Sequence, residues 1–119
     1  MSGRKHNVLV VDDQQVIRDT LQTALDDEGF TVETAANGQE ALDILERWQP
    51  CVILLDLMMP VMDGWAFRAE QKRSGSTVPV VLLSAAGELA THQVALDAAA
   101  VIAKPFDIDS VISTIEGVC

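Results

Sequence analysis

Short apolar runs alternate along the chain with longer segments in which apolar residues recur at helical spacing. The runs at 7–11, 51–55 and 78–83 are rich in Val, Ile and Leu and contain no polar alternation. Such continuous runs are typical of parallel strands that are buried on both faces of a sheet. Two weaker runs, at 31–35 and 99–103, are also interpreted as strands.

The segments between these runs are predicted to be helices. Ile17, Leu21 and Leu25 share one helical face, and Gly29 provides a C-terminal stop. Asn37 can cap a second helix, which must end before Pro50. The other helices are predicted from a cap at Asp63 to about residue 73, at about 88–98, and over the apolar positions Ile108, Val111, Ile112 and Ile115.

Strand and helix therefore alternate five times, which is the pattern of a doubly wound α/β sandwich. Right-handed crossovers would place helices on both faces of a parallel sheet. The length of 119 residues predicts one domain, covering 1–119. Ligands of such folds bind at the carboxyl ends of the strands, so chemistry is expected at that edge.

Three carboxylates, a hydroxyl and an ammonium group fall at the carboxyl ends of the predicted strands. Asp12 and Asp13 follow the first strand, Asp56 the third, Ser84 the fourth and Lys104 the fifth. Each has an ordinary explanation on its own, such as helix capping by the paired aspartates. Their coincidence at one edge favours a shared site instead. Close carboxylates repel one another and invite a cation, and an all-oxygen, partly open cluster suits Mg²⁺.

Composition narrows the range of partners. The formal net charge of −10 disfavours direct binding to nucleic acid or to an anionic membrane. We expect neither a signal peptide nor a membrane span, because no apolar stretch approaches about 18 residues.

The two cysteines are expected to stay unpaired. Cys51 opens an apolar run and is interpreted as a small buried hydrophobic residue, and Cys119 is expected to be mobile. Two such cysteines predict neither a disulfide framework nor a metal site, which favours a reducing compartment and a cytoplasmic location. Zn²⁺ is disfavoured at the acidic cluster, because His6 and His92 lie outside it.

Taken together, these motifs resemble the receiver domains of two-component response regulators over essentially the whole chain. The matching segments are Val-Asp-Asp at 11–13, Asn-Gly-x-Glu-Ala-Leu at 37–42, Leu-Asp-Leu-Met-Met-Pro-Val-Met-Asp-Gly at 55–64, Pro79 with Ser84-Ala85, and Lys104-Pro105-Phe106. The resemblance implies a flavodoxin-like receiver fold of the CheY-like superfamily, with five parallel strands in the order 2-1-3-4-5 and five helices. It also implies a phosphorylation-controlled switch in signal transduction, not an enzyme acting on other substrates.

The resemblance assigns a role to each residue of the acidic cluster. Asp56 is implied to be the phosphoacceptor, which becomes an aspartyl phosphate. The implied ligands of Mg²⁺ are Asp12, Asp13, Asp56 and the backbone carbonyl of Met58.

Lys104 and Ser84 complete the implied catalytic set. Lys104 would pair with Asp56 and then with the phosphoryl oxygens, and a cis peptide bond before Pro105 would aim it into the site. Ser84 would donate a hydrogen bond to the phosphoryl group and draw its loop inward. Val101 stands where the family usually carries a switching aromatic residue, so signal transmission is expected either to differ from the family's or to depend mostly on Ser84.

Other positions also depart from the family. The usual Gly-Ala reads Ala98-Ala99, and Arg68 and Lys72 occupy positions that are commonly apolar. Met58 and Ala86 lie where the family controls access of water to the phosphoryl group, and neither side chain orients a water well. We therefore expect slow self-dephosphorylation.

The implied partner is a histidine kinase or a histidine phosphotransfer protein, and the downstream target stays open. A homodimer through the predicted fourth helix, fifth strand and fifth helix (88–118) is a further possibility. The receiver is expected to occupy the whole chain, without an output domain.

Two alternatives remain at this point. The first is a pseudo-receiver, an interaction module that works without phosphorylation; Val101 favours it and the intact acidic cluster opposes it. The second is a phosphatase resembling the haloacid dehalogenases. That family needs a second aspartate two residues after the nucleophile, where this chain has Met58. No G-x-x-x-x-G-K-[ST] loop supports a nucleotide hydrolase.

Overall fold

Five parallel strands form one sheet in the order β2-β1-β3-β4-β5, as predicted. The structure is a computed structural model, and it describes residues 6–85 and 89–119. The strands are β1 (Asn7–Val11), β2 (Thr31–Ala35), β3 (Val52–Asp56), β4 (Val80–Ala85) and β5 (Ala100–Lys104). Each observed strand lies within two residues of its predicted bounds.

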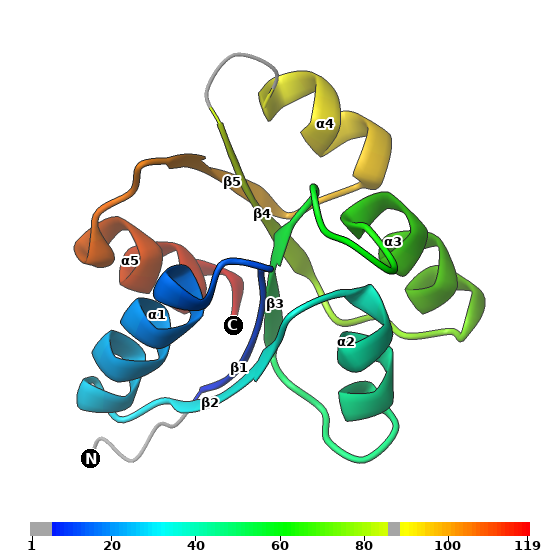
Figure 1. Cartoon of the computed structure of the whole chain (residues 1–119). Helices are drawn as coiled ribbons and strands as arrows, with labels where there is room; N and C mark the ends of the chain where they lie inside the picture. The colour runs from blue at the N-terminus through cyan, green and yellow to red at the C-terminus, as the bar shows by residue number, and fades with distance from the viewer. Residues whose placement is uncertain (1–5, 86–88) are drawn as a thin grey trace.

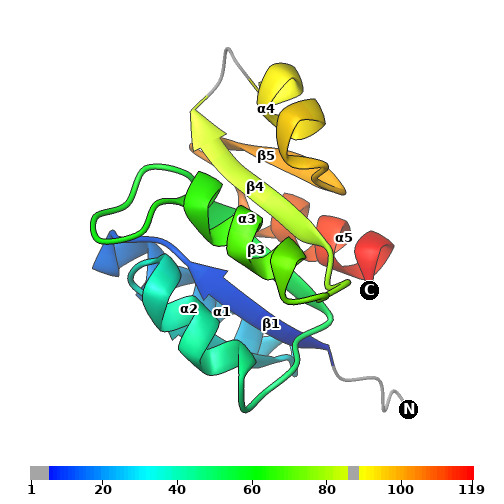
Figure 2. The same ribbon diagram turned by 90° about the vertical axis from the view of Figure 1, so that its right-hand side faces the viewer.

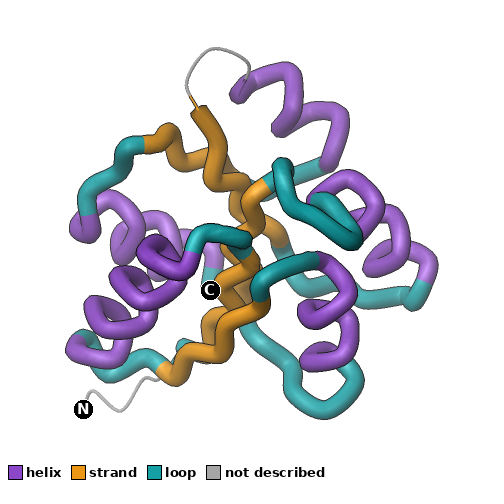
Figure 3. The backbone as a smooth tube through the Cα atoms, viewed as in Figure 1, coloured by secondary structure: helices purple, strands orange, loops and turns teal. Residues whose placement is uncertain are grey.

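Helices cover both faces of this sheet. They are α1 (Gln15–Asp27), α2 (Gly38–Leu45), α3 (Gly64–Arg73), α4 (Leu89–Leu96) and α5 (Ile108–Val118). Figure 1 shows α1 and α5 on one side of the strands and α2, α3 and α4 on the other. In Figure 3 the strands form a single layer between these two sets. The predicted start of the fourth helix, Glu88, lies outside the described residues.

Alternating residues of the central strands feed two hydrophobic cores. On β1, Val8 and Val10 face the core that includes Leu21 of α1 and Ile115 of α5. Their neighbours Leu9 and Val11 face the other core, where Phe67 of α3 is fully buried. The absence of polar alternation in these strands therefore reflects burial on both faces.

Two helix starts follow the predicted caps. The Asn37 side chain accepts a hydrogen bond from the Glu40 backbone N–H at 3.0 Å. The Asp63 side chain does the same for the Ala66 N–H at 2.9 Å. Both side chains satisfy donors that the first turn of a helix leaves unpaired.

The turn after α4 succeeds without glycine because Asp97 adopts a left-handed conformation, with φ at 54°. Aspartate tolerates this region better than most residues. The carbonyls that end α4 are held by Arg68, which is buried in α3. Its guanidinium donates to the carbonyl oxygens of Leu96 and Asp97, each at 2.9 Å. A polar residue at a commonly apolar position is thus explained by hydrogen bonds between α3 and the end of α4.

The prediction for the cysteines is wrong, because Cys51 and Cys119 form a disulfide with their Cα atoms 5.6 Å apart. Cys51 precedes β3 and Cys119 follows α5, which runs back toward the starts of the strands. Figure 2 shows the end of α5 on the side where the strands begin. The sequence places the two residues 68 positions apart and does not reveal this meeting. The cysteines therefore give no indication of a reducing compartment.

Candidate functional site

The carboxyl ends of β1, β3, β4 and β5 bring the predicted site residues together. A cavity of about 400 Å³ opens there and is lined by Asp13, Gln14, Asp56, Leu57, Met58, Ser84 and Lys104. Asp12 is fully buried directly beside it. The four strand ends therefore form one site, as the sequence predicts.

Asp12 has two functions in this arrangement. Its Oδ1 accepts a hydrogen bond from the Gln14 backbone N–H at 2.9 Å, at the start of α1. Its Oδ2 accepts one from the Lys104 ammonium at 3.0 Å. The same carboxylate thus holds the backbone just before α1 and contacts Lys104, and its role as a metal ligand stays a prediction. The backbone carbonyl of Asp12 also accepts a hydrogen bond from Arg18 at 2.8 Å.

Lys104 lies between two carboxylates. Its Nζ is 3.0 Å from Asp12 Oδ2 and 3.5 Å from Asp56 Oδ1. Lys104 is the last residue of β5, and the peptide bond between Lys104 and Pro105 is cis, as predicted. One ammonium group thus partly neutralises two buried or nearly buried acids.

Burial raises the pKa of the Asp56 carboxyl above its ordinary value of 3.8, and the nearby Asp12 carboxylate raises it further. Lys104 opposes this rise through its charge and its hydrogen bond, and Asp13 adds a smaller increase. The site therefore holds more negative charge than Lys104 alone can balance, so a second cation would lower the energy of the ionised form.

The donor set fits a small divalent cation. One oxygen each from Asp12, Asp13 and Asp56 lies within 4.8 Å of the other two. Asp13 is exposed, which leaves the cluster open to solvent on one side. Mg²⁺ favours such carboxylate sites, in which it keeps several of its water ligands. The Met58 side chain is 78 % exposed beside the cavity, and the role of its carbonyl as a ligand stays a prediction.

The loop after β3 depends on a close backbone approach at Gly64. A Cβ atom at this position would lie 2.7 Å from the Asp56 carbonyl oxygen and 2.8 Å from the Leu57 Cα. The Gly64 N–H donates to the Leu57 carbonyl at 2.9 Å. The absence of a side chain at Gly64 thus allows the loop to fold back against the backbone of Asp56 and Leu57.

Sequence reasoning did not identify Gly38 as part of this support. A Cβ atom there would lie 2.7 Å from the Met62 Cγ, and the Gly38 N–H donates to the Met62 carbonyl at 2.9 Å. The sequence predicts Asn37 as a helix cap, but the contact of Gly38 with the distant loop is a tertiary feature. Gln14, which lines the cavity, was missed for the same reason.

Ser84 and Val101 lie on neighbouring strands. Ser84 lines the cavity near the end of β4, as its predicted role requires. Val101 is opposite Leu82 in the β4–β5 register and packs against the core on the α4 side. Ala86 and its predicted influence on water lie outside the described residues.

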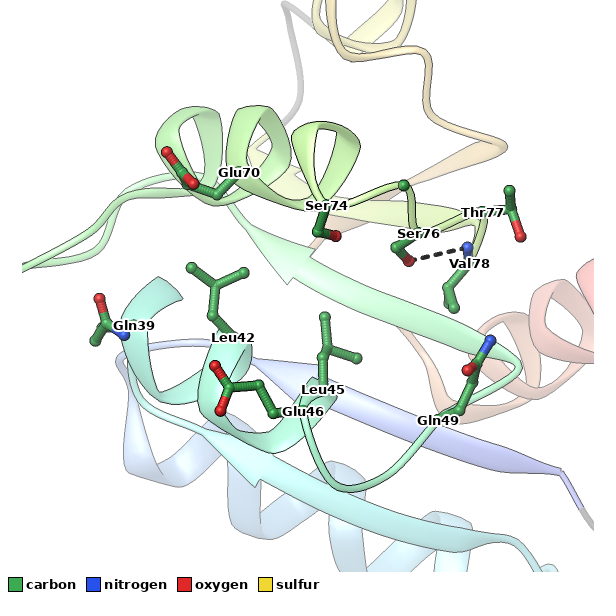
Figure 4. A pocket seen from close by; sticks show the side chains of 11 residues that line it. Gln39, Leu42, Leu45, Glu46, Gln49, Glu70, Ser74, Ser76, Thr77 and Val78 are labelled. Carbon is green, nitrogen blue, oxygen red and sulfur yellow. Dashed lines mark hydrogen bonds between the residues drawn. The ribbon is translucent and has the colours of Figure 1, made fainter.

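A second hollow, of about 490 Å³, lies between α2 and α3 (Figure 4). Its lining carries the acids Glu46 and Glu70, the apolar Leu42 and Leu45, and several hydroxyl and amide groups. None of its lining residues is basic, so it offers no charge that would favour a phosphate. The Asp56 cavity, in contrast, contains the ammonium group of Lys104.

The doubly wound sheet, with an acidic cluster and a lysine at its carboxyl edge, points to a signalling domain, and comparison with known proteins agrees. The family model of the response regulator receiver domain matches residues 8–116. The chain belongs to this family of two-component response regulators.

Two similar proteins are a transcriptional regulator and a response regulator by name. The chain is 40 % identical over 108 residues to a probable transcriptional regulator, ycf27, of Porphyra purpurea, covering 89 % of this chain and 44 % of that protein. It is 33 % identical to the response regulator MprA of Mycolicibacterium vanbaalenii over the same share of this chain and 47 % of that protein. The chain thus spans less than half the length of these relatives.

A solved structure supports the same assignment. The chemotaxis protein CheY4 of Vibrio cholerae superposes with a TM-score of 0.87 at 33 % identity, covering 98 % of this chain and 100 % of that one. The receiver domain of the Francisella response regulator 1452 gives a TM-score of 0.87 at 28 % identity, covering 95 % of each chain. In the part of the chain that is described, no helix combines the length and apolar character of a membrane span.

Proposed function

We propose that Asp56 accepts a phosphoryl group from the phosphohistidine of a histidine kinase or a phosphotransfer protein. Mg²⁺ would be held by Asp12, Asp13, Asp56 and the Met58 backbone carbonyl. One observation carries the proposal: three carboxylates converge within 4.8 Å, and Lys104 reaches two of them. A cytoplasmic location, where such donors act, is part of the same proposal.

The residues can perform the transfer without a general base. A carboxylate oxygen of Asp56 attacks the phosphorus, the bond between phosphorus and the donor's imidazole nitrogen breaks, and the imidazole leaves with the bonding electron pair. Lys104 can turn from the carboxylates to the incoming phosphoryl oxygens, because its Nζ already lies at the cavity. When bound, Mg²⁺ would supply further positive charge to those oxygens.

Ser84 connects the site to the rest of the molecule. Its hydroxyl lines the cavity, and β4 leads from it toward α4. A hydrogen bond from Ser84 to the phosphoryl group would draw this strand end inward and bias the position of α4. Since Val101 replaces the usual aromatic residue, we assign the main switching role to Ser84.

The proposal is tested by incubation with acetyl phosphate and Mg²⁺, followed by intact-mass measurement. We expect a gain of about 80 Da, the mass of one phosphoryl group, on the wild-type chain. EDTA should abolish the gain, and so should Asp56→Asn. Asp63→Asn provides a matched control, since Asp63 lies on the same loop as a helix cap, and it should still be labelled.

A phosphohistidine donor should be used if acetyl phosphate gives no label. Failure with both donors, in a chain that remains folded, would contradict phosphotransfer and favour the pseudo-receiver. Labelling that survives in Asp56→Asn would contradict the assignment of the phosphoacceptor. Repeated turnover of small phosphate esters would favour a phosphatase instead.

A further inference from the structure

Three soft or borderline metal ligands meet at the edge of the sheet where the strands begin. His6 directly precedes β1, Cys51 precedes β3 and Cys119 follows α5. One ligand atom from each lies within 4.8 Å of the other two. This cluster lies at the end of the sheet opposite the acidic cavity.

Two of the three residues are held firmly. The Cys51 backbone N–H donates to the Asn7 carbonyl at 2.7 Å, which fixes the start of β3 against β1. His6 is 9 % exposed, and its ring packs edge-on against Phe30 with the centroids 5.1 Å apart. Cys119, in contrast, is exposed and follows the last turn of α5. The cluster therefore combines two fixed donors with one that can adjust.

The redox state of the sulfurs decides what this cluster can bind. In the disulfide, neither sulfur is a thiolate, which is the form of cysteine that binds metals. A dithiol reductant would break the sulfur–sulfur bond by exchange, giving up two electrons and two protons to the cysteines and becoming a cyclic disulfide. The reduced pair then offers two sulfur ligands beside the His6 imidazole.

Two thiolates and one imidazole select Zn²⁺ over Mg²⁺. At a Zn–S distance of about 2.3 Å, the two sulfurs must move apart from their bonded positions. The exposed Cys119 can supply this movement, and the Cα separation of 5.6 Å already brings both side chains within reach of one ion. A water molecule can occupy the fourth position.

We propose that reduction of the Cys51–Cys119 disulfide converts this edge of the sheet into a Zn²⁺ site formed by His6, Cys51 and Cys119. The end of α5 is then tied to the starts of β1 and β3 in both states. A covalent bond does so in the oxidised chain, and a metal ion does so in the reduced chain. The inference does not depend on phosphotransfer at Asp56.

The test uses Co²⁺ as a coloured substitute for Zn²⁺. The full chain is reduced with a phosphine, exchanged into oxygen-free buffer and titrated with Co²⁺ while absorbance is recorded. We expect a thiolate-to-cobalt charge-transfer band that saturates at one Co²⁺ per chain, is lost on addition of Zn²⁺, and is absent from the oxidised chain. Circular dichroism checks that the reduced chain remains folded.

Single substitutions assign the ligands. Cys119→Ser and His6→Ala should each weaken Zn²⁺ binding, measured by competition with a coloured chelator, by at least about 10-fold. His92→Ala is the matched control, since the other histidine of the chain lies on α4, and it should leave the affinity unchanged. Asp56→Asn should also retain the band, because no cysteine lines the acidic cavity and a thiolate is needed for the charge transfer.

Three results would overturn the proposal. The first is a folded, reduced chain that gives no charge-transfer band. The second is a band whose Zn²⁺ affinity does not change in His6→Ala and Cys119→Ser. The third is a disulfide that the phosphine cannot reduce in the folded chain, since the site would then never form under native conditions.

Discussion

A single lysine nitrogen sets the electrostatic balance of the acidic cavity. Lys104 lies 3.0 Å from Asp12 and 3.5 Å from Asp56, so its charge is shared between two acids instead of paired with one. Burial and repulsion from Asp12 still raise the pKa of Asp56 above its ordinary value. The fold therefore makes the ionised form of Asp56 less favourable than it is in water, and a bound cation would offset this cost.

Removal of this charge should stabilise the fold. The folded state raises the pKa of Asp56, so the folded chain is more stable when Asp56 is protonated. This contribution to the free energy of unfolding is fully present at low pH and is lost as the pH rises through the folded-state pKa. Asp56→Asn should therefore increase the free energy of unfolding at pH 7. The gain should shrink as the pH falls toward 4. Urea denaturation without Mg²⁺, at several pH values, measures the difference.

Added Mg²⁺ provides the control for that experiment. It should stabilise the wild type more than Asp56→Asn and so reduce the advantage of the variant. The predicted direction would be contradicted if the stability gain of Asp56→Asn over the wild type were smaller at pH 7 than at pH 4.

The positive charge of Lys104 should matter more for the transfer rate than for stability. Lys104→Ala removes a charge that can bind the phosphoryl oxygens, and we expect labelling by acetyl phosphate to slow by about 100-fold. Time-resolved intact mass gives the rate. Lys72→Ala, on the exposed face of α3, should be labelled at the wild-type rate. Equal rates for the two variants would contradict the proposed role of Lys104.

The phosphoryl group itself should be long-lived. Met58 points into solvent beside the cavity, and its thioether cannot orient an attacking water strongly. After removal of the donor, the added mass should decay over times much longer than seconds with Mg²⁺ present. Decay within seconds would show that another group positions the water.

Among the elements, the contact between α3 and α4 is the most unusual. Arg68 is buried and donates to two carbonyls at the end of α4, while Gln71 accepts a third hydrogen bond from it at 2.7 Å. Burial lowers the pKa of the Arg68 guanidinium, and Asp97 opposes this effect. In receiver domains this position of the third helix is commonly apolar. In this chain, α3 is instead joined to the end of α4 by hydrogen bonds from Arg68.

Arg68→Leu should therefore be strongly destabilising, although leucine is apolar and similar in length to the buried part of arginine. The change would leave the carbonyls of Leu96 and Asp97 without their donor, at a cost of about 2–4 kcal/mol in the free energy of unfolding. Chemical denaturation monitored by circular dichroism tests this. The exposed ion pair of Lys72 with Asp97 makes Lys72→Ala a suitable control, with a loss below about 1 kcal/mol.

The helices and strands were predicted well from the sequence, because capping and burial depend on residues that are close together along the chain. Asn37 and Asp63 cap helices through their own side chains, and buried strands require continuous apolar runs. The meeting of the acidic residues was predictable too, since Asp12, Asp56, Ser84 and Lys104 all lie at or just after the carboxyl ends of strands of one sheet. The role of Arg68 could not be predicted, and the sequence showed only a basic residue at a commonly apolar position. Its hydrogen-bond partners lie 28 and 29 residues away, outside the sequence of α3.

On the scale of the whole molecule, the disulfide was the largest error of sequence-based prediction. Cys51 and Cys119 are 68 residues apart, and each looks ordinary beside its own neighbours. Their meeting follows from the direction of α5, which returns from the acidic edge to the edge where the strands begin. This placement depends on the assembled fold and not on any local pattern.

A cross-link over this separation should contribute substantially to stability. The chain-entropy model gives about 4 kcal/mol for a closed loop of this length. Cys119→Ser opens the loop at an exposed position without creating a cavity, and we expect it to lower the free energy of unfolding by up to that amount in metal-free buffer. Urea denaturation of the oxidised chain and the variant gives the difference. A chemically reduced wild type should behave like the variant, and a difference below about 0.5 kcal/mol would contradict the model.

The position of Cys119 also determines how the chain can be attached to a surface. In a Cys51→Ala variant, Cys119 would be the single thiol of the sequence, exposed after α5 at the edge opposite Asp56. A strand of five residues rises about 17 Å, so a linker at that edge stays clear of the acidic cavity. Chains immobilised on maleimide beads through this thiol would all present Asp56 outward. Such an oriented array would allow the phosphodonor proteins of the proposed function to be tested for binding from solution, with and without EDTA.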